Sequence, residues 1–397
     1  MPRIATSINK NNLEILKENV IFKFNKTFSK PIDCEALSKD ILIETNELIN
    51  AISLKRLFGF VESKFNPSNN TLDILSKYIG AKNWFTYTEI LSKEKLISND
   101  ELRLILSAYD FDTINEITNY DGGIQSVSRK FAEKLRNSPS SFLRISEALA
   151  KNKNSQIFFI EHFPDYDNLI PFYYKIFEQY LKYKKTDEAQ VFGNSILFLK
   201  SFWQNNKNDC KNYIKKVNKI GVSLNYHPYV IGRFYAVNLL YTYFYNGKDV
   251  DFLTHKIYET AEQMPKDGKH FKDFPAFQYI ISEAFLHIKK YYDVLKIINQ
   301  SCENYKIKPE FVKKGYYRQM QMFKAEALWE LGDKKEAEFI LNKVNPNKFY
   351  FFSKKYYTAI YLILKYKIKT DNNSYNMAKR IIKEMENDFL MNKLNLH

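Results

Sequence analysis

The stretch that decides the fold is "FKAEALWELGDKKEAEFILNKVNP", residues 323–346. Small and large residues recur in it at helical spacing, on either side of a glycine and before a proline. The small residues let two helices approach closely, the large ones fill the space between them, and the glycine suits a tight turn. The stretch therefore predicts a helical hairpin, whose key positions in chain order are Ala325, Leu328, Gly332, Ala337, Leu341 and Pro346.

The composition extends this prediction to the whole chain. The chain has 397 residues, with only 11 Gly and 11 Pro, and it is rich in Lys, Glu, Leu, Ile and aromatic residues. Turn-dense β folds need more Gly and Pro, whereas these residues favour helices. We therefore expect an all-α protein, and the length allows two or three domains.

Weaker versions of the hairpin surround Phe252, Val294 and Ala378. The corresponding positions 252, 294, 337 and 378 are 42, 43 and 41 residues apart, whereas an earlier version at Ala189 lies 63 residues before 252. The hairpin resembles a tetratricopeptide repeat, although the spacing exceeds the usual repeat length of about 34 residues. The resemblance implies a right-handed solenoid of helical hairpins with lengthened helices.

The stretch "LSKDILIETNELINAISLKRLFGF", residues 37–60, predicts a second kind of structure. It divides into a helix to Thr45, a turn, and a second helix with Asn50 as its N-cap, which is helix-turn-helix spacing. The next stretch, "NPSNNTLDILSKYIGA", predicts a loop and a supporting helix that is capped by Asn69 or Asn70 and ends at Gly80. The apolar residues expected in the small core are Ile41, Ile49, Ile52, Leu54, Leu57, Leu72, Leu75 and Ile79.

This order of helices is similar to the lambda-repressor/Cro-like class of helix-turn-helix domains. It also resembles N-terminal modules of uncharacterised bacterial proteins, over about residues 34–91. In that class the second helix enters the DNA major groove. By position, Ala51 and Lys55 are expected to approach bases, while Asn50, Ser53 and Arg56 touch phosphates or neighbouring bases; Lys64, Asn69 and Asn70 add backbone contacts. Two acidic residues, Glu44 and Glu47, lie close enough to repel phosphate, so a module that binds only protein remains an alternative.

The chain carries a formal net charge of +15, which suits an acidic partner. Residues 1–95 hold 14 basic and 11 acidic residues, a net charge of +3, which leaves +12 for the other 302 residues. The basic character therefore belongs to the whole chain and does not single out a DNA-contacting segment. The most apolar stretch, residues 229–245, contains Arg233 and Asn238, so we expect a buried helix rather than a membrane span.

No recognisable catalytic or metal-binding motif is apparent. The three cysteines, Cys34, Cys210 and Cys302, are far apart, and the six histidines form no metal-binding pattern. Acidic residues cluster in "EHFPDYDN", residues 161–168, where a helix cap explains them better than a metal site. No signal-peptide pattern opens the sequence. We expect a cytoplasmic, non-enzymatic protein without a cofactor or metal.

Together these patterns predict a helical arm over residues 1–32, a helix-turn-helix-like domain over 33–92, connecting helices over 93–155 and a repeat domain over 156–397. This arrangement is similar to that of peptide-responsive bacterial transcription regulators. The resemblance implies double-stranded DNA as one partner, a homodimer, and a peptide or protein in the repeat groove, held by Arg233, Asn238, Arg318 and Gln321. The alternative is a protein-interaction scaffold; an RNA-binding repeat protein ranks third.

Overall fold

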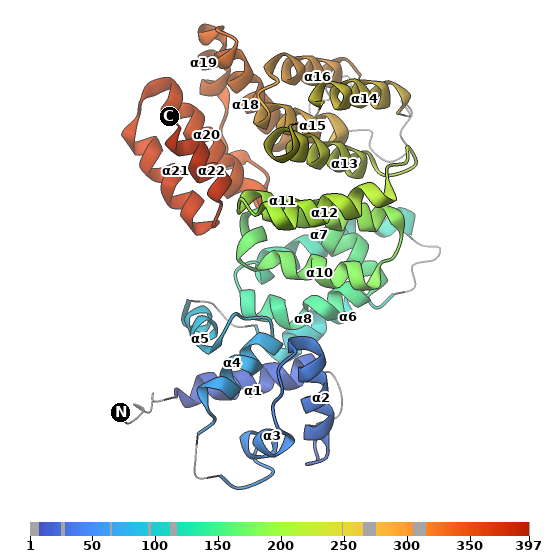
Figure 1. Cartoon of the computed structure of the whole chain (residues 1–397), viewed down its shortest axis with the longest axis vertical. Coiled ribbons are helices and arrows are strands. Elements are labelled where there is room, and N and C mark those ends of the chain that lie inside the picture. The colour runs from blue at the N-terminus through green and yellow to red at the C-terminus, as the bar shows by residue number, and fades with distance from the viewer. Residues whose placement is uncertain are drawn as a thin grey trace. The chain divides into compact units, whose positions relative to one another are not determined.

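The chain is described by a computed structural model over residues 8–24, 28–63, 66–93, 97–111, 117–247, 249–264, 275–304 and 315–396. These residues contain helices and no strand, which confirms the all-α fold class. The chain divides into two compact units, residues 1–163 and 164–397, which we call the N-terminal unit and the repeat unit (Figure 1). The four domain ranges inferred from the sequence stay predictions.

The N-terminal unit consists of helices joined by short turns. In chain order these are α1 (Lys10–Phe24), α2 (Asp33–Thr45), α3 (Ala51–Leu57), α4 (Asn69–Tyr78), α5 (Trp84–Lys93), α6 (Asn99–Ser107), α7 (Ile117–Leu135), α8 (Pro139–Lys151), α9 (Lys153–Ser155) and the π-helix η1 (Gln156–Glu161).

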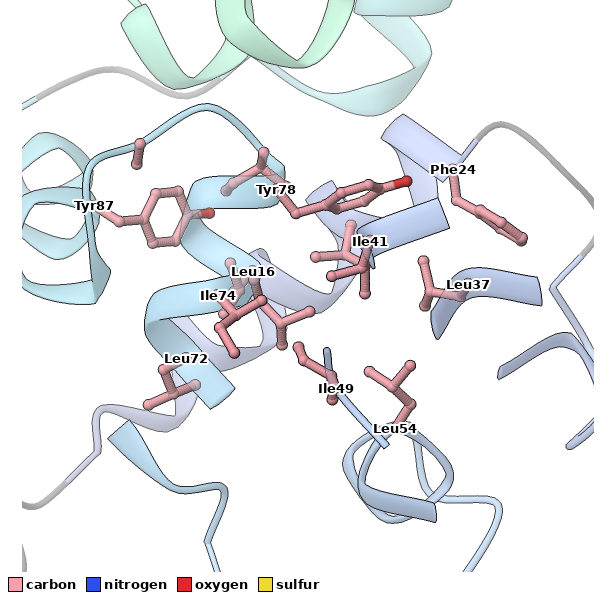
Figure 2. Packing of buried hydrophobic residues seen from close by; sticks show 14 of the residues in the cluster. Leu16, Phe24, Leu37, Ile41, Ile49, Leu54, Leu72, Ile74, Tyr78 and Tyr87 are labelled. Atoms are coloured by element: carbon pink, nitrogen blue, oxygen red, sulfur yellow. The ribbon is translucent and has the colours of Figure 1, made fainter. Parts of the chain in front are cut away.

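Helices α1 to α5 share one apolar core, which Figure 2 shows from close by. Leu16 of α1 and Ile74 of α4 meet near its centre, and Leu54 points from the short helix α3 into the core. Seven residues are too few for a helix to be stable in isolation, so α3 depends on this packing. The core also includes Ile41, Ile49, Leu72, Leu75 and Ile79, as expected from the sequence.

Helix α8 begins at Pro139, because the fixed φ and missing N–H of proline suit the first turn of a helix. Ser141 lies within this first turn and is buried, and its hydroxyl accepts a hydrogen bond from the Ile97 backbone N–H at 3.2 Å.

The repeat unit is a stack of helical hairpins. Its elements are the 3₁₀ helix η2 (Tyr166–Asn168), the π-helix η3 (Leu169–Tyr173), α10 (Tyr174–Tyr183), α11 (Asp187–Trp203), α12 (Lys207–Ile220), α13 (Pro228–Tyr241), the π-helix η4 (Thr242–Asn246), α14 (Val250–Gln263), α15 (Ala276–His287), α16 (Tyr291–Asn304), α18 (Gly315–Glu330), α19 (Lys334–Lys343), the 3₁₀ helices η5 (Pro346–Lys348) and η6 (Phe351–Ser353), α20 (Lys354–Lys369), α21 (Asn372–Glu384) and α22 (Asp388–Asn395).

The hairpin read from residues 323–346 is confirmed. It corresponds to α18 and α19, which pack against each other, and Gly332 turns between them with a φ of 95°. Ala325 and Ala337 are fully buried, as two close helices require. The equivalent positions Val294 in α16 and Ala378 in α21 are also fully buried.

The structure corrects one of the predicted repeat positions and explains the one irregular spacing between them. Phe252 is 55% exposed and is not a tight-packing position, because the buried face of α14 is formed by Thr254, Ile257 and Thr260. The gap of 63 residues after Ala189 arises because α12 follows α11 as an additional helix and packs along it.

Residues 229–245 form α13 and η4, and most of α13 is buried within the repeat unit. Across the described part of the chain, no helix combines the length and the apolar character needed to span a bilayer.

Candidate nucleic-acid interface and repeat-unit cavity

The turn between α2 and α3 is built around Asn46. This residue has a φ of 57°, and its N–H donates to the Leu42 carbonyl at 2.9 Å. The left-handed conformation strains most side chains, but asparagine tolerates it. Asn46 therefore supplies the sharp turn between the two helices.

The start of α3 is fixed by Asn50, as predicted. Its backbone is extended and its side-chain oxygen accepts a hydrogen bond from the Ile52 N–H at 2.8 Å. On the α2 side, the Ser38 hydroxyl donates to the Ile49 carbonyl at 2.6 Å and ties the turn to its preceding helix. The end of the turn next to α3 is therefore held by two side-chain hydrogen bonds, and Ala51, which is half-buried, begins the helix.

The residues of α3 that are expected to contact DNA differ in their exposure and in whether they already form an ion pair. Lys55 is half-buried, with its Nζ 3.2 Å from the Glu35 carboxylate. Arg56 is exposed and makes no ion pair with any residue that the structure describes. Ser53 is half-buried beside them. Arg56 is therefore the better candidate for a contact with DNA. Lys55 would first have to break its ion pair with Glu35 before it could bind a phosphate.

Ile52 was expected in the core, and this was wrong: its side chain is 53% exposed. The inward positions of α3 are set by Leu54, which is fully buried, and by Leu57, which packs against the core from its edge. Ile52 lies two positions from Leu54, which is close to the opposite side of a helix with 3.6 residues per turn.

The two acidic residues that argued against DNA binding are both paired with lysines. The carboxylate of Glu44 lies 3.7 Å from Lys23 Nζ, and that of Glu47 lies 2.5 Å from Lys77 Nζ. Each pair is close to neutral, so its repulsion of a phosphate is much weaker than that of a lone carboxylate.

The first turn of α4 lies next in the chain after the loop that follows α3. Its cap is Ser68, whose hydroxyl accepts from the Thr71 N–H at 3.1 Å, so the expectation that Asn69 or Asn70 is the cap was wrong. Asn69 and Asn70 instead form the exposed first turn, where helical N–H groups and the helix dipole favour an anion. Lys64 lies outside the described residues.

The repeat unit contains a small cavity of about 20 Å³, which is room for about one water molecule. Helices α11, α13, α15 and α20 and the segment η2 form its wall. Aromatic and aliphatic side chains make up most of the wall, together with Arg233, Glu283 and His287. Helices that lie far apart in the sequence thus line this hollow.

Arg233 is buried, with 5% of its surface exposed. Its Nη2 donates hydrogen bonds of 3.0 Å to the hydroxyls of Tyr166 and Tyr229, and the guanidinium carbon lies 5.2 and 5.1 Å from the two ring centres. Its Nε is buried without a hydrogen-bond partner. No carboxylate of the described residues forms an ion pair with it. A guanidinium does not lose its proton in a protein, so a positive charge is held here without a direct counterion.

Glu283 lies across the cavity wall and has partners of its own. The Tyr357 hydroxyl donates to it at 3.1 Å, and His287 Nε2 lies 3.8 Å from its other oxygen. Burial acts to raise the pKa of Glu283, but His287 and the charge of Arg233 outweigh burial and lower the pKa below its ordinary value. Glu283 is therefore a carboxylate in the folded protein.

A chain of tyrosine hydroxyls extends from this carboxylate. The Tyr357 hydroxyl lies 2.5 Å from that of Tyr279, which is 2.7 Å from Gln319 Oε1, while His287 Nε2 lies 3.2 Å from the Tyr356 hydroxyl. Burial raises the pKa of all the buried tyrosines around the cavity well above its ordinary value, so they are neutral; these are Tyr166, Tyr279, Tyr356 and Tyr357.

Of the four residues expected to bind a ligand, only Arg233 lines the cavity. Asn238 is half-buried and donates to the Phe234 carbonyl of its own helix at 2.8 Å. Arg318 and Gln321 are half-buried on α18 and do not belong to the cavity wall.

Glu283, His287 and the tyrosines were not singled out from the sequence. A usable signal was present, because Glu283 and His287 lie four residues apart in the otherwise apolar stretch "AFQYIISEAFLH", residues 276–287. Ionisable residues on a helix that is apolar on all sides are buried together, and they are retained only where they find partners or a function.

The acidic cluster after residue 160 has a structural role in the repeat unit. The Asp165 side chain caps η2, and Asp167 accepts the Tyr356 N–H at 3.0 Å. Among the described residues, no three His, Cys, Asp or Glu side chains come together in a way that would hold a metal ion.

No protein-family model matches the chain, and neither a curated protein nor a solved structure matches it significantly.

Proposed function

We propose that the protein is a DNA-binding transcription regulator. Its N-terminal unit contacts double-stranded DNA through α3, and its repeat unit binds a peptide or protein and mediates dimerisation. The observation that carries the proposal is that the side-chain-capped helix α3 presents an exposed Arg56, which forms no ion pair with any described residue. The structure also leaves the positive end of α4 exposed at the next turn, which supports a phosphate contact.

The expected roles follow from the geometry of these groups. Arg56 can offer two parallel N–H donors to a guanine edge or to a phosphate. Asn69 and Asn70 present side-chain and backbone donors to the DNA backbone, which positions the module without reading sequence. Lys55 contributes charge once Glu35 is displaced from it.

The test begins with selection of bound DNA from a random pool, using the full chain. For a selected duplex, Arg56→Ala is expected to weaken binding by roughly 1–3 kcal/mol, and Lys55→Ala by less because Lys55 is already paired. Affinity is measured by fluorescence anisotropy at several salt concentrations. Each lost phosphate contact makes the salt dependence shallower by about 0.9 in log–log slope.

Arg103→Ala is the matched control, because Arg103 is an exposed arginine of the same unit, paired only within α6. It should leave both affinity and salt slope unchanged. A pool that yields no enriched sequence, or an Arg56→Ala variant that binds as the unchanged protein does, contradicts the proposal.

The second candidate is a protein-interaction scaffold, and one observation favours it. Four large apolar side chains of the α2–turn–α3 segment are exposed: Leu42 by 42%, Ile43 by 77%, Leu48 by 66% and Ile52 by 53%. Exposed apolar side chains in such number are typical of protein contacts. If this segment docks a protein, Ile52→Glu abolishes binding of a stoichiometric partner and Arg56→Ala does not; for the DNA regulator the effect of Arg56→Ala dominates.

A further inference from the structure

Helix α12 of the repeat unit carries regularly spaced lysines on its exposed face. Its sequence, "KNDCKNYIKKVNKI" at residues 207–220, has a lysine at every fourth position from the first, and we call these four the lysine row. A step of four residues moves about 6 Å along a helix and turns by only about 40°, so the row extends over about 18 Å. The row and the neighbouring Lys216 are all exposed; its members are Lys207, Lys211, Lys215 and Lys219.

The lysines of α12 differ from those of another helix in lacking acidic partners among the described residues. None of the five forms an ion pair with a residue that the structure describes. Helix α20 also contains five lysines, and four of them pair with carboxylates: Lys355, Lys365, Lys367 and Lys369. The acidic residue of α12, Asp209, is half-buried in the first turn and accepts a hydrogen bond from the Asn206 side chain at 2.8 Å. The charges of the lysine row are therefore available to a partner.

Stabilisation of α12 itself does not explain the lysine row. Like charges four residues apart on a helix repel each other and weaken the helix, and the row contains three such pairs. A cation is also unfavourable in the first turn, where Lys207 lies, because the helix dipole is positive there. The helix is held instead by Cys210, Ile214 and Val217, which are buried within the repeat unit. An anionic partner along the row would relieve the repulsion.

The chemistry of the exposed face narrows the class of partner. No large apolar side chain of α12 is exposed, so the helix has nothing to insert into a lipid bilayer. Asn208 and Asn212 are exposed next to lysines and can donate hydrogen bonds to oxygen acceptors. A strand of DNA has one phosphate per about 3.4 Å of the helix axis, so about five phosphates lie along a row of this length. Lysine contacts a phosphate as a point charge and reads no sequence from it.

We propose that the exposed face of α12 binds the phosphate backbone of double-stranded DNA without sequence preference. Five lysines and one aspartate give this helix a net charge of +4. The proposal goes beyond the proposed function, because it gives the repeat unit a DNA contact of its own and does not require α3 to recognise a sequence.

The test removes three lysines of the row from the full chain, in the variant Lys211→Gln, Lys215→Gln, Lys219→Gln. Affinity for a random-sequence duplex is measured by fluorescence anisotropy at several salt concentrations. Loss of three phosphate contacts should make the log–log salt dependence shallower by about 2.7, at about 0.9 for each contact, and should weaken binding roughly tenfold at low salt. Because the variant relieves repulsion between lysines, its urea midpoint should not fall below that of the parent. The same triple exchange to arginine keeps the charges and should bind as the parent does.

A matched control has the same net charge as the glutamine variant of α12. Lys256→Gln, Lys355→Gln, Lys369→Gln removes three exposed lysines of the repeat unit, each of which forms an ion pair with a glutamate. This control should leave the salt dependence unchanged, because the lysines that it removes contact no phosphate. Equal losses in the two triple variants would assign the attraction to net charge alone and overturn the proposal.

Three further outcomes would also overturn it. If the glutamine variant of α12 binds the random duplex as the parent does, the lysine row makes no contact with DNA. If vesicles of phosphatidylserine and phosphatidylcholine bind the parent more tightly than the duplex does, and the α12 variant loses this binding, the partner is a membrane. If poly-glutamate binds the row more tightly than a duplex of equal charge, the partner is an acidic protein. None of these outcomes depends on Arg56, so sequence-specific binding through α3 is judged separately.

Discussion

At the scale of single residues, the repeat unit holds charges in places where apolar side chains would pack at lower cost. Arg233 and Glu283 lie in helices α13 and α15, whose other side chains are mostly apolar and buried. Buried ionic groups contribute little to stability when compared with apolar residues of similar volume. Packing of the core alone therefore does not explain why these two positions carry charged residues.

The charge of Glu283 makes the stability of the fold depend on pH. Its pKa in the folded protein lies below the ordinary value of 4.5, so its carboxylate stabilises the fold fully above that pH. The contribution is lost as the pH falls from 4.5 through the folded-state pKa. Glu283→Gln is expected to lower the free energy of unfolding by about 2 kcal/mol near neutral pH, because a charged hydrogen-bond acceptor is lost.

The measurement is urea unfolding of parent and variant across the acidic range. The difference between them should shrink once the pH falls below 4.5. Glu262→Gln, at an exposed position in the same unit, is the control and should leave the free energy of unfolding unchanged at every pH. A difference that grows toward acidic pH contradicts the assignment of Glu283 as a carboxylate.

At the scale of elements, caps and turns position α3 more than the intrinsic stability of that helix does. The sequence predicted the Asn50 cap correctly, because an Asn directly before a helical run has one strong local role. It misplaced the cap of α4, where Ser68, Asn69 and Asn70 are all good capping residues in a row. It also misplaced Ile52, because the helical phase of a seven-residue segment depends on the core that it meets.

The Asn50 cap can be tested directly. Asn50→Ala removes the hydrogen bond to the Ile52 N–H and should destabilise the N-terminal unit by about 1 kcal/mol. Because α3 is short, the same variant should weaken binding to a selected duplex, whereas Asn50→Ser, which also caps, should retain it. Chemical denaturation and anisotropy provide the two measurements. Equal behaviour of the Ala and Ser variants would show that the cap has no role.

The cavity was less accessible to sequence reasoning than the helices. Its wall comes from η2, α11, α13, α15 and α20, so it spans residues 166–357. The periodicity of the sequence assigns the residues of the cavity wall to the buried faces of their helices, but it does not indicate which of these faces meet. Arg233 was singled out because a charge interrupts an apolar run, and Tyr166 carried no comparable signal.

At the scale of the whole molecule, charge is distributed unevenly between the units. Residues 1–163 contain 22 basic and 20 acidic residues, a net charge of +2, whereas residues 164–397 contain 38 and 25, a net charge of +13. The unit that carries α3 is thus nearly neutral. Non-specific attraction to nucleic acid is expected to come mainly from the repeat unit, and sequence-specific contacts from the N-terminal unit.

This distribution predicts two separable kinds of DNA binding. Affinity for a random duplex should fall steeply with salt and should not respond to Arg56→Ala, because that variant changes one charge in 15. Affinity for a selected duplex should fall both with added salt and with Arg56→Ala. Paired salt titrations of the two duplexes provide the measurement. An equal loss on both duplexes would assign Arg56 to general electrostatic attraction instead of recognition.

The last helix of the repeat unit has a further consequence. Phe389 of α22 contacts the ring of His287 with centres 5.1 Å apart and that of Phe202 at 4.6 Å, and Lys393 is 2.5 Å from the buried Glu326 of α18. His287 thus faces the cavity with one part of its ring and α22 with another. Loss of α22 would therefore uncover the ring of His287 and leave the buried Glu326 carboxylate without Lys393.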